Sequence, residues 1–284
     1  MIKNIMFIIL KMFNVNPIVH ISIDENFDTI IPSLVTRKNT FRLSLVALNA
    51  GTIKIYIITF LFSPQTFKFS ELNFIKALHF DKVQHRKTDI ELQAMTDTYE
   101  VQTLQKINND DKAMQEEFLK IRISENNDSL SNIFDKLNYY TTIILAFSAA
   151  LIYAYSKLIE FQLNITTYLI YYIAFINLLD LLDLILLLRR SVSISGFIRS
   201  SFKDLRKSKT TYALTKALYF DWAASTDDVK YYAGLTKNTE MRSFRVILLG
   251  FFLLISTTIF YNNAENDNSG TLFYLQSYTS LTKQ

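Results

Sequence analysis

The sequence predicts a mostly α-helical integral membrane protein with three transmembrane helices, a small N-terminal cytoplasmic β unit and a helical stalk. Long apolar segments in the second half of the chain and alternating apolar residues in the N-terminal part carry this prediction. All three prolines fall within the first 64 residues, which favours a helical remainder because proline breaks helix interiors. The mean hydropathy of +0.15 is high for a soluble chain. The expected divisions are a β-rich module (1–80), a helical stalk (81–136), a transmembrane hairpin (137–188), a basic cytoplasmic helical segment (189–243), a third transmembrane helix (244–262) and an extracytoplasmic tail (263–284).

The N-terminal part has the period of two that half-buried strands show. Residues 17–23, 41–46 and 52–58 alternate in character, and Asn49-Ala-Gly51 is the expected turn between the last two. Residues 43–62 are long enough to cross a membrane, but this turn and Lys54 lie in their middle, so strands are favoured and insertion stays an alternative. Residues 1–13 hold an apolar run too short to span and no small-residue cleavage site, so we expect no signal peptide.

Residues 81–124 predict the stalk, because they are polar, rich in helix-forming residues and carry apolar side chains at helical spacing. Residues 108–111 interrupt this pattern and predict a break between two helices. Residues 126–129, with the sequence Asn-Asn-Asp-Ser, predict a cap for the first turns of the following helix.

Three segments have the composition of membrane spans. Residues 137–156 run for 20 residues without a charge, residues 168–188 are apolar except for three polar side chains, and residues 246–261 are uncharged but shorter. A helix needs about 20 apolar residues to cross the hydrocarbon core. The alternative is a soluble bundle, whose buried helices are usually shorter and have a polar face. We therefore expect membrane insertion.

The distribution of basic residues predicts the orientation of these spans. Residues 189–245 carry 12 Lys and Arg against 5 Asp and Glu, whereas the loop between the first two spans holds only Lys157 and Glu160. The basic loop therefore belongs in the cytoplasm of a bacterial cell, together with the N-terminal 136 residues. We expect a multi-pass protein of the inner membrane.

The second span carries the most informative residues, which are Asn177, Asp180 and Asp183 at successive i, i+3 positions of one helix face. A carboxylate at membrane depth is expensive, so these side chains should face partner helices or water. One hypothesis is that subunits assemble and the carboxylates line a cation-conducting pore. The alternative is structural: Asp183 pairs with Arg190, or protonated carboxyls donate hydrogen bonds between helices.

The first span offers a surface for helix packing, because small residues recur every four positions. Such stripes let helix backbones approach closely in lipid, either within one chain or between copies. The stripe consists of Thr142, Ala146, Ala150 and Ala154.

Two sets of basic residues are candidates for contacts with anions. The first follows the second span and is expected at the membrane surface, where each charge attracts anionic lipid by roughly 1 kcal/mol, with a soluble anionic ligand as the alternative. It comprises Arg189, Arg190, Arg199, Lys203, Arg206, Lys207 and Lys209. The second lies in the N-terminal part, where a nucleotide or phosphate would need cations, although solvated clusters are more common. It comprises Arg37, Lys38, Lys82, Arg86 and Lys87.

The sequence gives little support to catalysis. The absence of cysteine excludes disulfides, thiolate metal sites and cysteine nucleophiles. His79 and His85 are six residues apart, which matches no usual metal-ligand spacing. Gly-rich phosphate loops and nucleophile motifs do not occur. We therefore expect no enzymatic activity, no cofactor and no metal.

Residues 129–261 resemble the transmembrane effectors of bacterial anti-phage systems of the Pycsar, CBASS and Hailong kind. The resemblance rests on Asp135-Lys136 before a first span, a tight hairpin, a basic cytoplasmic helical segment, and the stretch from Leu218-Tyr-Phe to Tyr231-Tyr232 before a last span. Residues 17–23 and 43–51 are similar to a small β-sandwich module found in many bacterial proteins. The resemblance implies a cytoplasmic sensor coupled to spans that form a pore or disrupt the inner membrane on infection.

Two functions follow as hypotheses. The first is a homo-oligomeric membrane effector that opens a pore when it meets a nucleotide or oligonucleotide signal, or the cytosolic enzyme that makes this signal. The second is a non-conducting anchor or assembly subunit that recruits a cytosolic enzyme to the lipid bilayer. A pore should need Asp180 or Asp183, whereas an anchor should tolerate Asn at both positions.

Overall fold

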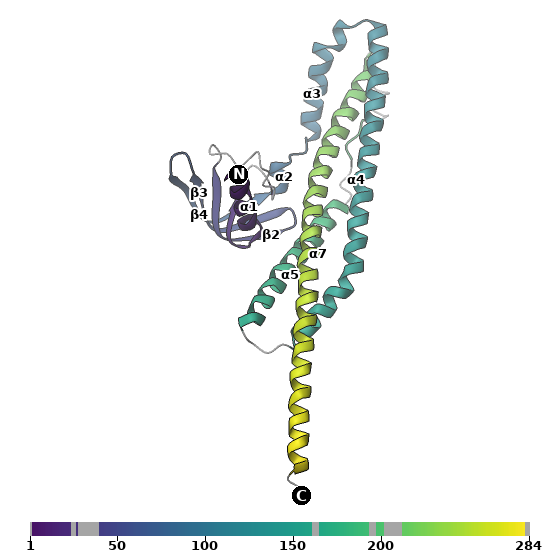
Figure 1. Cartoon of the computed structure of the whole chain (residues 1–284). Coiled ribbons are helices and arrows are strands. Elements are labelled where there is room, and N and C mark those ends of the chain that lie inside the picture. Colours follow the sequence, from purple (N-terminus) through teal and green to yellow (C-terminus); the bar gives the residue numbers. More distant parts are fainter. Residues whose placement is uncertain are drawn as a thin grey trace. The chain divides into compact units, whose positions relative to one another are not determined.

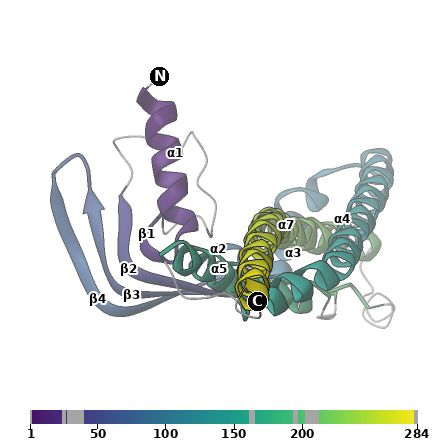
Figure 2. The same cartoon turned by 60° about the horizontal axis from the view of Figure 1, so that its bottom comes forward.

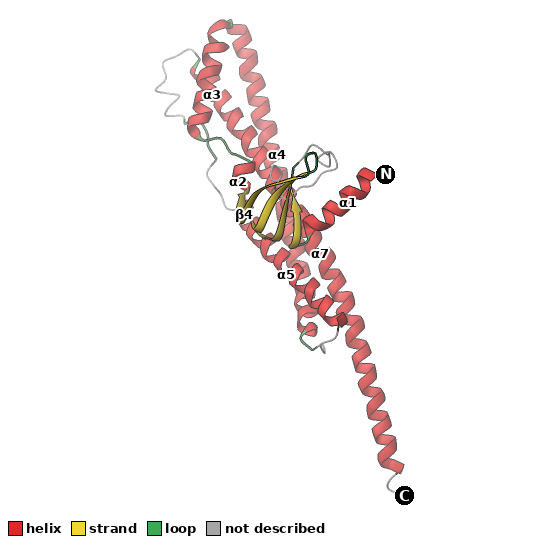
Figure 3. Ribbon diagram, turned by 90° about the vertical axis from the view of Figure 1, so that its left-hand side faces the viewer, coloured by secondary structure: helices red, strands yellow, loops and turns green. Residues whose placement is uncertain are grey.

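The computed structural model describes residues 2–23, 27, 40–160, 165–192, 197–201 and 212–281, with side chains from residue 4 to residue 259. The chain is mostly helical, with a small N-terminal antiparallel sheet and three long apolar helices, as the sequence predicts (Figures 1 and 3). It divides into two compact units. Unit 1 comprises residues 1–139 and 185–240, and unit 2 comprises residues 140–184 and the chain from residue 241 onward.

The sheet of unit 1 has four antiparallel strands in the order β1-β2-β3-β4 (Figure 2). These are β1 (Ile18–Ser22), β2 (Phe41–Ala50), β3 (Ile53–Ser63) and β4 (Lys68–His79). The β2–β3 hairpin turns at Gly51, whose φ of +64° favours glycine, so the prediction of two strands rather than a membrane segment for residues 43–62 is confirmed. Strand β4 was not predicted, because its mixture of Lys, Glu and Asn with Phe and Leu hides the alternation.

Helix α1 (Ile2–Val15) packs one face on this sheet, and Figure 2 shows it standing beside the strands. Leu10 lies in a core cluster with Ile23 and Phe41, and Met6 and Phe7 pack against the cluster. The Asn14 side chain then donates a hydrogen bond of 3.0 Å to the Ile21 carbonyl. A segment too short to cross a membrane is thus helical and fixed to the β module.

The stalk region contains α2 (Phe80–Val83), α3 (Asp89–Gln102) and the 3₁₀ turn η2 (Leu104–Lys106). Thr88 and Glu91 form a capping box, which satisfies backbone donors at the start of α3. The break predicted at residues 108–111 is confirmed, because α4 (Asn109–Leu158) begins there. The cap predicted at residues 126–129 is wrong: these residues lie inside α4, and the Asn126 amide donates to the hydroxyls of Ser225 and Thr226.

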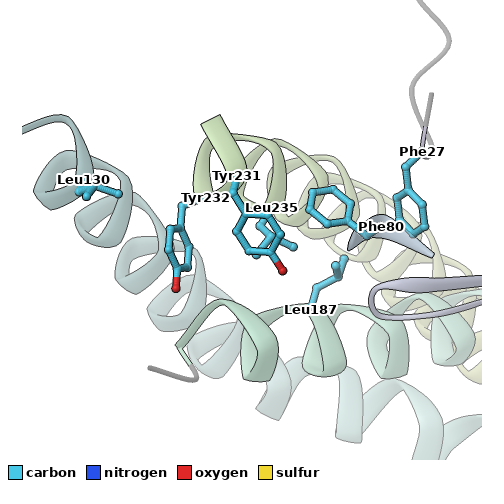
Figure 4. Packing of buried hydrophobic residues seen from close by; sticks show 7 residues of the cluster. All are labelled: Phe27, Phe80, Leu130, Leu187, Tyr231, Tyr232 and Leu235. Carbon is cyan, nitrogen blue, oxygen red and sulfur yellow. The ribbon is translucent and has the colours of Figure 1, made fainter. Parts of the chain in front are cut away.

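The core of unit 1 gathers side chains from α2, α4, α5 (Ile165–Val192) and α7 (Ala213–Leu281) (Figure 4). Phe80 packs edge-to-face on Tyr231 with ring centroids 5.6 Å apart. Leu187 is buried in this cluster, so the last turns of α5 belong to unit 1. The second apolar segment of the sequence therefore serves two environments, which its hydropathy does not reveal.

Helix α7 begins within the predicted basic segment, at Ala213, and runs without interruption through the predicted third span and most of the predicted tail. The boundaries expected near residues 243 and 262 are not helix ends. The chain has no proline after Pro64, so no proline breaks the helix at these boundaries.

Unit 2 contains residues 140–158 of α4, 165–184 of α5 and 241–259 of α7. These belong to the three helices of the described chain that are long and apolar enough to cross a membrane. Ala154, Leu158, Ala174 and Leu253 belong to the core cluster of this unit. Many other large apolar side chains are exposed, among them Leu145, Ile152, Leu169, Phe175, Leu182, Leu248, Phe251, Phe252, Ile255 and Ile259.

Candidate functional site

Three polar residues of α5 lie on one face and are buried within unit 2, as their i, i+3 spacing predicts. Asn177 is 0% exposed, Asp180 is 4% exposed and Asp183 is 2% exposed. Leu178 and Leu182, between them in the sequence, are exposed. The helix thus presents apolar side chains outward and carboxylates inward.

Two arginines of α7 face these carboxylates. Arg242 places its Nε 2.7 Å from Oδ2 of Asp183 and its Nη1 3.3 Å from Oδ1 of Asp180. The Nη2 atom of Arg245 lies 2.7 Å from Oδ2 of Asp180. These four residues, which we call the α5–α7 ion cluster, contain two carboxylates and two guanidiniums, so their formal charges cancel. This balance lets charged groups remain buried.

Hydrogen bonds extend the α5–α7 ion cluster toward α4. The Asn177 amide donates to the Val246 carbonyl at 2.9 Å and accepts from the Tyr155 hydroxyl at 2.8 Å. Tyr155 also lies 3.2 Å from the Ala174 carbonyl, to which it donates. Side chains from all three helices of unit 2 therefore meet around one polar centre.

The alternative pairing of Asp183 with Arg190 is wrong. Asp183 pairs with Arg242, and Arg190 lies in unit 1 with its Nη2 3.3 Å from Oδ2 of Asp81. Asp180 and Asp183 contact guanidiniums of the same chain, so in this arrangement their carboxylates face arginine side chains. The sequence held a signal for this arrangement: Arg242 and Arg245 have the same i, i+3 spacing just before the third apolar segment.

The stripe of small residues on α4 is only partly used within the chain. Ala154 is buried in the core of unit 2 and Ala150 is half-buried, whereas Thr142 and Ala146 are exposed. The close approach between α4 and α7 occurs instead at Gly250 of α7. A Cβ added there would lie 2.5 Å from the Phe147 ring and 2.6 Å from Leu151.

Unit 1 contains a second ion cluster, between the segment after α2, residue 199 and α7. Asp228 pairs with Arg86, and its Oδ2 lies 3.3 Å from Nη1 of Arg199. Oδ2 of the neighbouring Asp227 accepts a hydrogen bond of 2.6 Å from the backbone of Lys87. The Arg86 guanidinium also lies over the ring of Tyr231.

This second cluster changes the interpretation of the basic candidates. Arg86 and Lys87, expected as ligand-binding residues, are engaged with carboxylates of α7, and so is Arg199 of the basic segment. Lys82 and Arg189 are exposed, and Arg190 is paired with Asp81. The other candidates lie outside the described residues; they are Arg37, Lys38, Lys203, Arg206, Lys207 and Lys209.

Asp81 connects this part of unit 1 to α7. The Tyr231 hydroxyl donates a hydrogen bond of 2.6 Å to Oδ1 of Asp81. Burial, followed by this hydrogen bond to a carboxylate, raises the pKa of Tyr231 above its ordinary value. The phenol therefore stays protonated as a donor over the whole neutral range.

A polar cavity of about 440 Å³ also lies in unit 1, lined in part by Thr96, Arg199, Ser200, Lys216 and Phe220. Nζ of Lys216 lies 2.7 Å from Oδ1 of Asp97 and 2.6 Å from Oε2 of Glu100, so carboxylates surround the cations here. The cavity is not an evident site for an anion. Within the described ranges, His, Asp and Glu side chains form no group of three that would hold a metal ion.

Comparison with known proteins gives no relative: no family model matches the sequence, and no curated protein or solved structure is similar to it. The interpretation of the α5–α7 ion cluster therefore rests on its own geometry.

Proposed function

We propose that the chain is a multi-pass membrane protein whose unit 2 crosses a bacterial inner membrane. The helical segments of unit 2 have about 20 residues each, which at 1.5 Å per residue gives about 30 Å, the thickness of a hydrocarbon core. Their exposed Leu, Ile and Phe side chains support this assignment, because lipid tails would cover them. The 10 basic residues between 189 and 240 favour a cytoplasmic unit 1 and N-terminus.

We further propose that the protein is a signal-gated membrane effector that depolarises the membrane, with the α5–α7 ion cluster as its latch. The observation that carries this proposal is the burial of two Asp–Arg pairs among three apolar helices. Paired, the charges are tolerated in an apolar surrounding. Separated, they need water, since unpaired charges in lipid are expensive. A state in which α5 and α7 part at this cluster is therefore hydrated.

A trigger would act by favouring the hydrated state over the paired state. We place phage infection upstream of it, sensed in the cytoplasm through a nucleotide signal or the enzyme that makes one. The exposed Thr142 and Ala146 of α4 would allow copies of the chain to pack closely around the opened path.

Membrane potential in expressing bacteria tests this proposal. Asp180→Asn with Asp183→Asn removes both carboxylates, so Arg242 and Arg245 lose these counter-ions. We expect this double variant to depolarise cells at expression levels where the wild type does so only after phage challenge. Carboxylates that line a conducting pore, the hypothesis from the sequence, would instead give weaker depolarisation in the double variant. The matched control is the charge exchange Asp183→Arg with Arg242→Asp, which keeps a carboxylate and a guanidinium at these two positions. This variant should respond to phage challenge as the wild type does. Leu145→Ala, at an exposed apolar position, controls for substitution alone.

The second candidate is the non-conducting anchor, and one observation favours it: the α5–α7 ion cluster is balanced in charge, as a purely structural ion pair would be. The same experiment decides between the two. If wild type and double variant are present in the membrane at equal amounts and neither depolarises it under any condition, the latch is rejected and the anchor remains.

A further inference from the structure

Helix α1 has two apolar faces, of which the β module uses only one. Met6, Phe7 and Leu10 pack toward the sheet. The other face is exposed, although it is apolar: Met12 is 68% exposed and Ile8 is 56% exposed. The same face includes Ile5, Ile9 and Phe13, which are also exposed. A 14-residue helix of a soluble module rarely leaves such a surface to water.

The spacing of the exposed residues shows that they form one surface. Positions 5, 8, 9, 12 and 13 follow the i, i+3, i+4, i+7, i+8 pattern, which gives a continuous stripe along a helix. This stripe, which we call the outer α1 stripe, extends over most of the helix. It therefore provides a contact surface rather than scattered apolar side chains.

The charges of α1 indicate what would cover this stripe. Lys3 and Lys11 are the only charged residues among the first 15, so the segment is purely basic. Two copies of α1 in contact would bring like charges together, whereas anionic lipid headgroups would attract both lysines. The helix is about 21 Å long at 1.5 Å per residue, too short to cross a hydrocarbon core. A short basic helix with an exposed apolar stripe suits the interface of a bilayer.

We propose that α1 is an in-plane membrane helix: the outer α1 stripe inserts among the acyl chains of an anionic bilayer, and the exposed Lys11 contacts its headgroups. The β module is then held at the membrane surface through its own N-terminal helix. This contact is distinct from the spans of unit 2 and is not needed for the latch.

The absence of cysteine makes a direct test possible, because each introduced cysteine is a unique labelling site. The full chain, reconstituted in nanodiscs of phosphatidylcholine and phosphatidylglycerol, would carry the fluorophore NBD at Met12→Cys. Leu145→Cys, at an exposed apolar position of unit 2, is the positive control for lipid contact. Glu117→Cys, an exposed polar position of α4 in unit 1, is the control for water.

We expect a blue-shifted NBD emission at Met12→Cys, and we expect nitroxide-labelled lipid to quench this emission. Neither effect is expected at Glu117→Cys. Replacing phosphatidylglycerol by phosphatidylcholine, or changing Lys3 and Lys11 to Gln, should reduce the quenching at Met12→Cys and leave that at Leu145→Cys unchanged.

Two outcomes at Met12→Cys would overturn the proposal. Emission as in water means that the stripe stays exposed, and a blue shift without quenching by nitroxide lipid means that protein, such as a second copy, covers it. Lack of quenching at Leu145→Cys would reject the spans of unit 2 instead. The two positions are measured separately, so failure of one proposal is not mistaken for failure of the other.

Discussion

The two Asp–Arg clusters of this protein use the same chemistry in different surroundings. In unit 1, Asp228 holds Arg86 and Arg199, whose side chains are 21% and 30% exposed. In unit 2, Asp180 and Asp183 hold Arg242, whose side chain is 4% exposed, among helices covered with apolar residues. A guanidinium that loses its partner in unit 1 can turn to water or to the ring of Tyr231. The Arg242 side chain of unit 2 is too deeply buried to turn to water in this arrangement. The surroundings, rather than the pair, decide whether water can replace a lost ion-pair partner.

The largest expected effect comes from removing a cation of unit 2. Arg242→Gln removes the guanidinium that contacts both Asp180 and Asp183, and breaking a buried pair of this kind costs about 3–5 kcal/mol. We expect a strongly lowered thermal midpoint of the detergent-solubilised protein. Size-exclusion chromatography of samples heated to increasing temperatures measures this midpoint. Asp183→Arg with Arg242→Asp should recover much of the loss. If the single variant melts like the wild type, the α5–α7 ion cluster carries no stability and the contrast with unit 1 fails.

A smaller effect is expected in unit 1. Asp228→Asn removes the carboxylate from Arg86 and Arg199, but both guanidiniums are partly exposed to water. We therefore expect a loss of about 2 kcal/mol, the size of a hydrogen bond to a charged group. Denaturant unfolding followed by the fluorescence of Trp222, the single tryptophan, measures it in unit 1. Asp227→Asn is the matched control, since Asp227 is bonded mainly to the Lys87 backbone. A loss equal to that of Arg242→Gln would contradict the role given to the surroundings.

The sequence predicted the elements better than it predicted their partners. The apolar segments, the Gly51 hairpin and the break before residue 109 follow from local patterns, which the structure confirms. The shared face of Asn177, Asp180 and Asp183 also follows from helical spacing. Their partners did not, because Arg242 lies 59 residues beyond Asp183 and looked like part of a basic loop. The two environments of α5 could not be predicted for a related reason. Leu187 and Leu182 have the same hydropathy, but Leu187 is buried in unit 1 and Leu182 is exposed in unit 2.

The smallest expected effect is a dependence of stability on alkaline pH that belongs to unit 1. Burial and the hydrogen bond to Asp81 raise the pKa of Tyr231, while Arg190 partly opposes the shift. In the unfolded chain a tyrosine ionises near pH 10, so this contribution to stability is fully present below about pH 10 and is lost as the pH rises through the folded pKa. The midpoint of Trp222-detected unfolding should therefore fall more steeply above pH 10 in the wild type than in Tyr231→Phe. Equal slopes would show that the Tyr231 hydroxyl ionises as easily folded as unfolded. The ring of Tyr231 would then remain a packing partner of Phe80, without a bond to Asp81 that matters for stability.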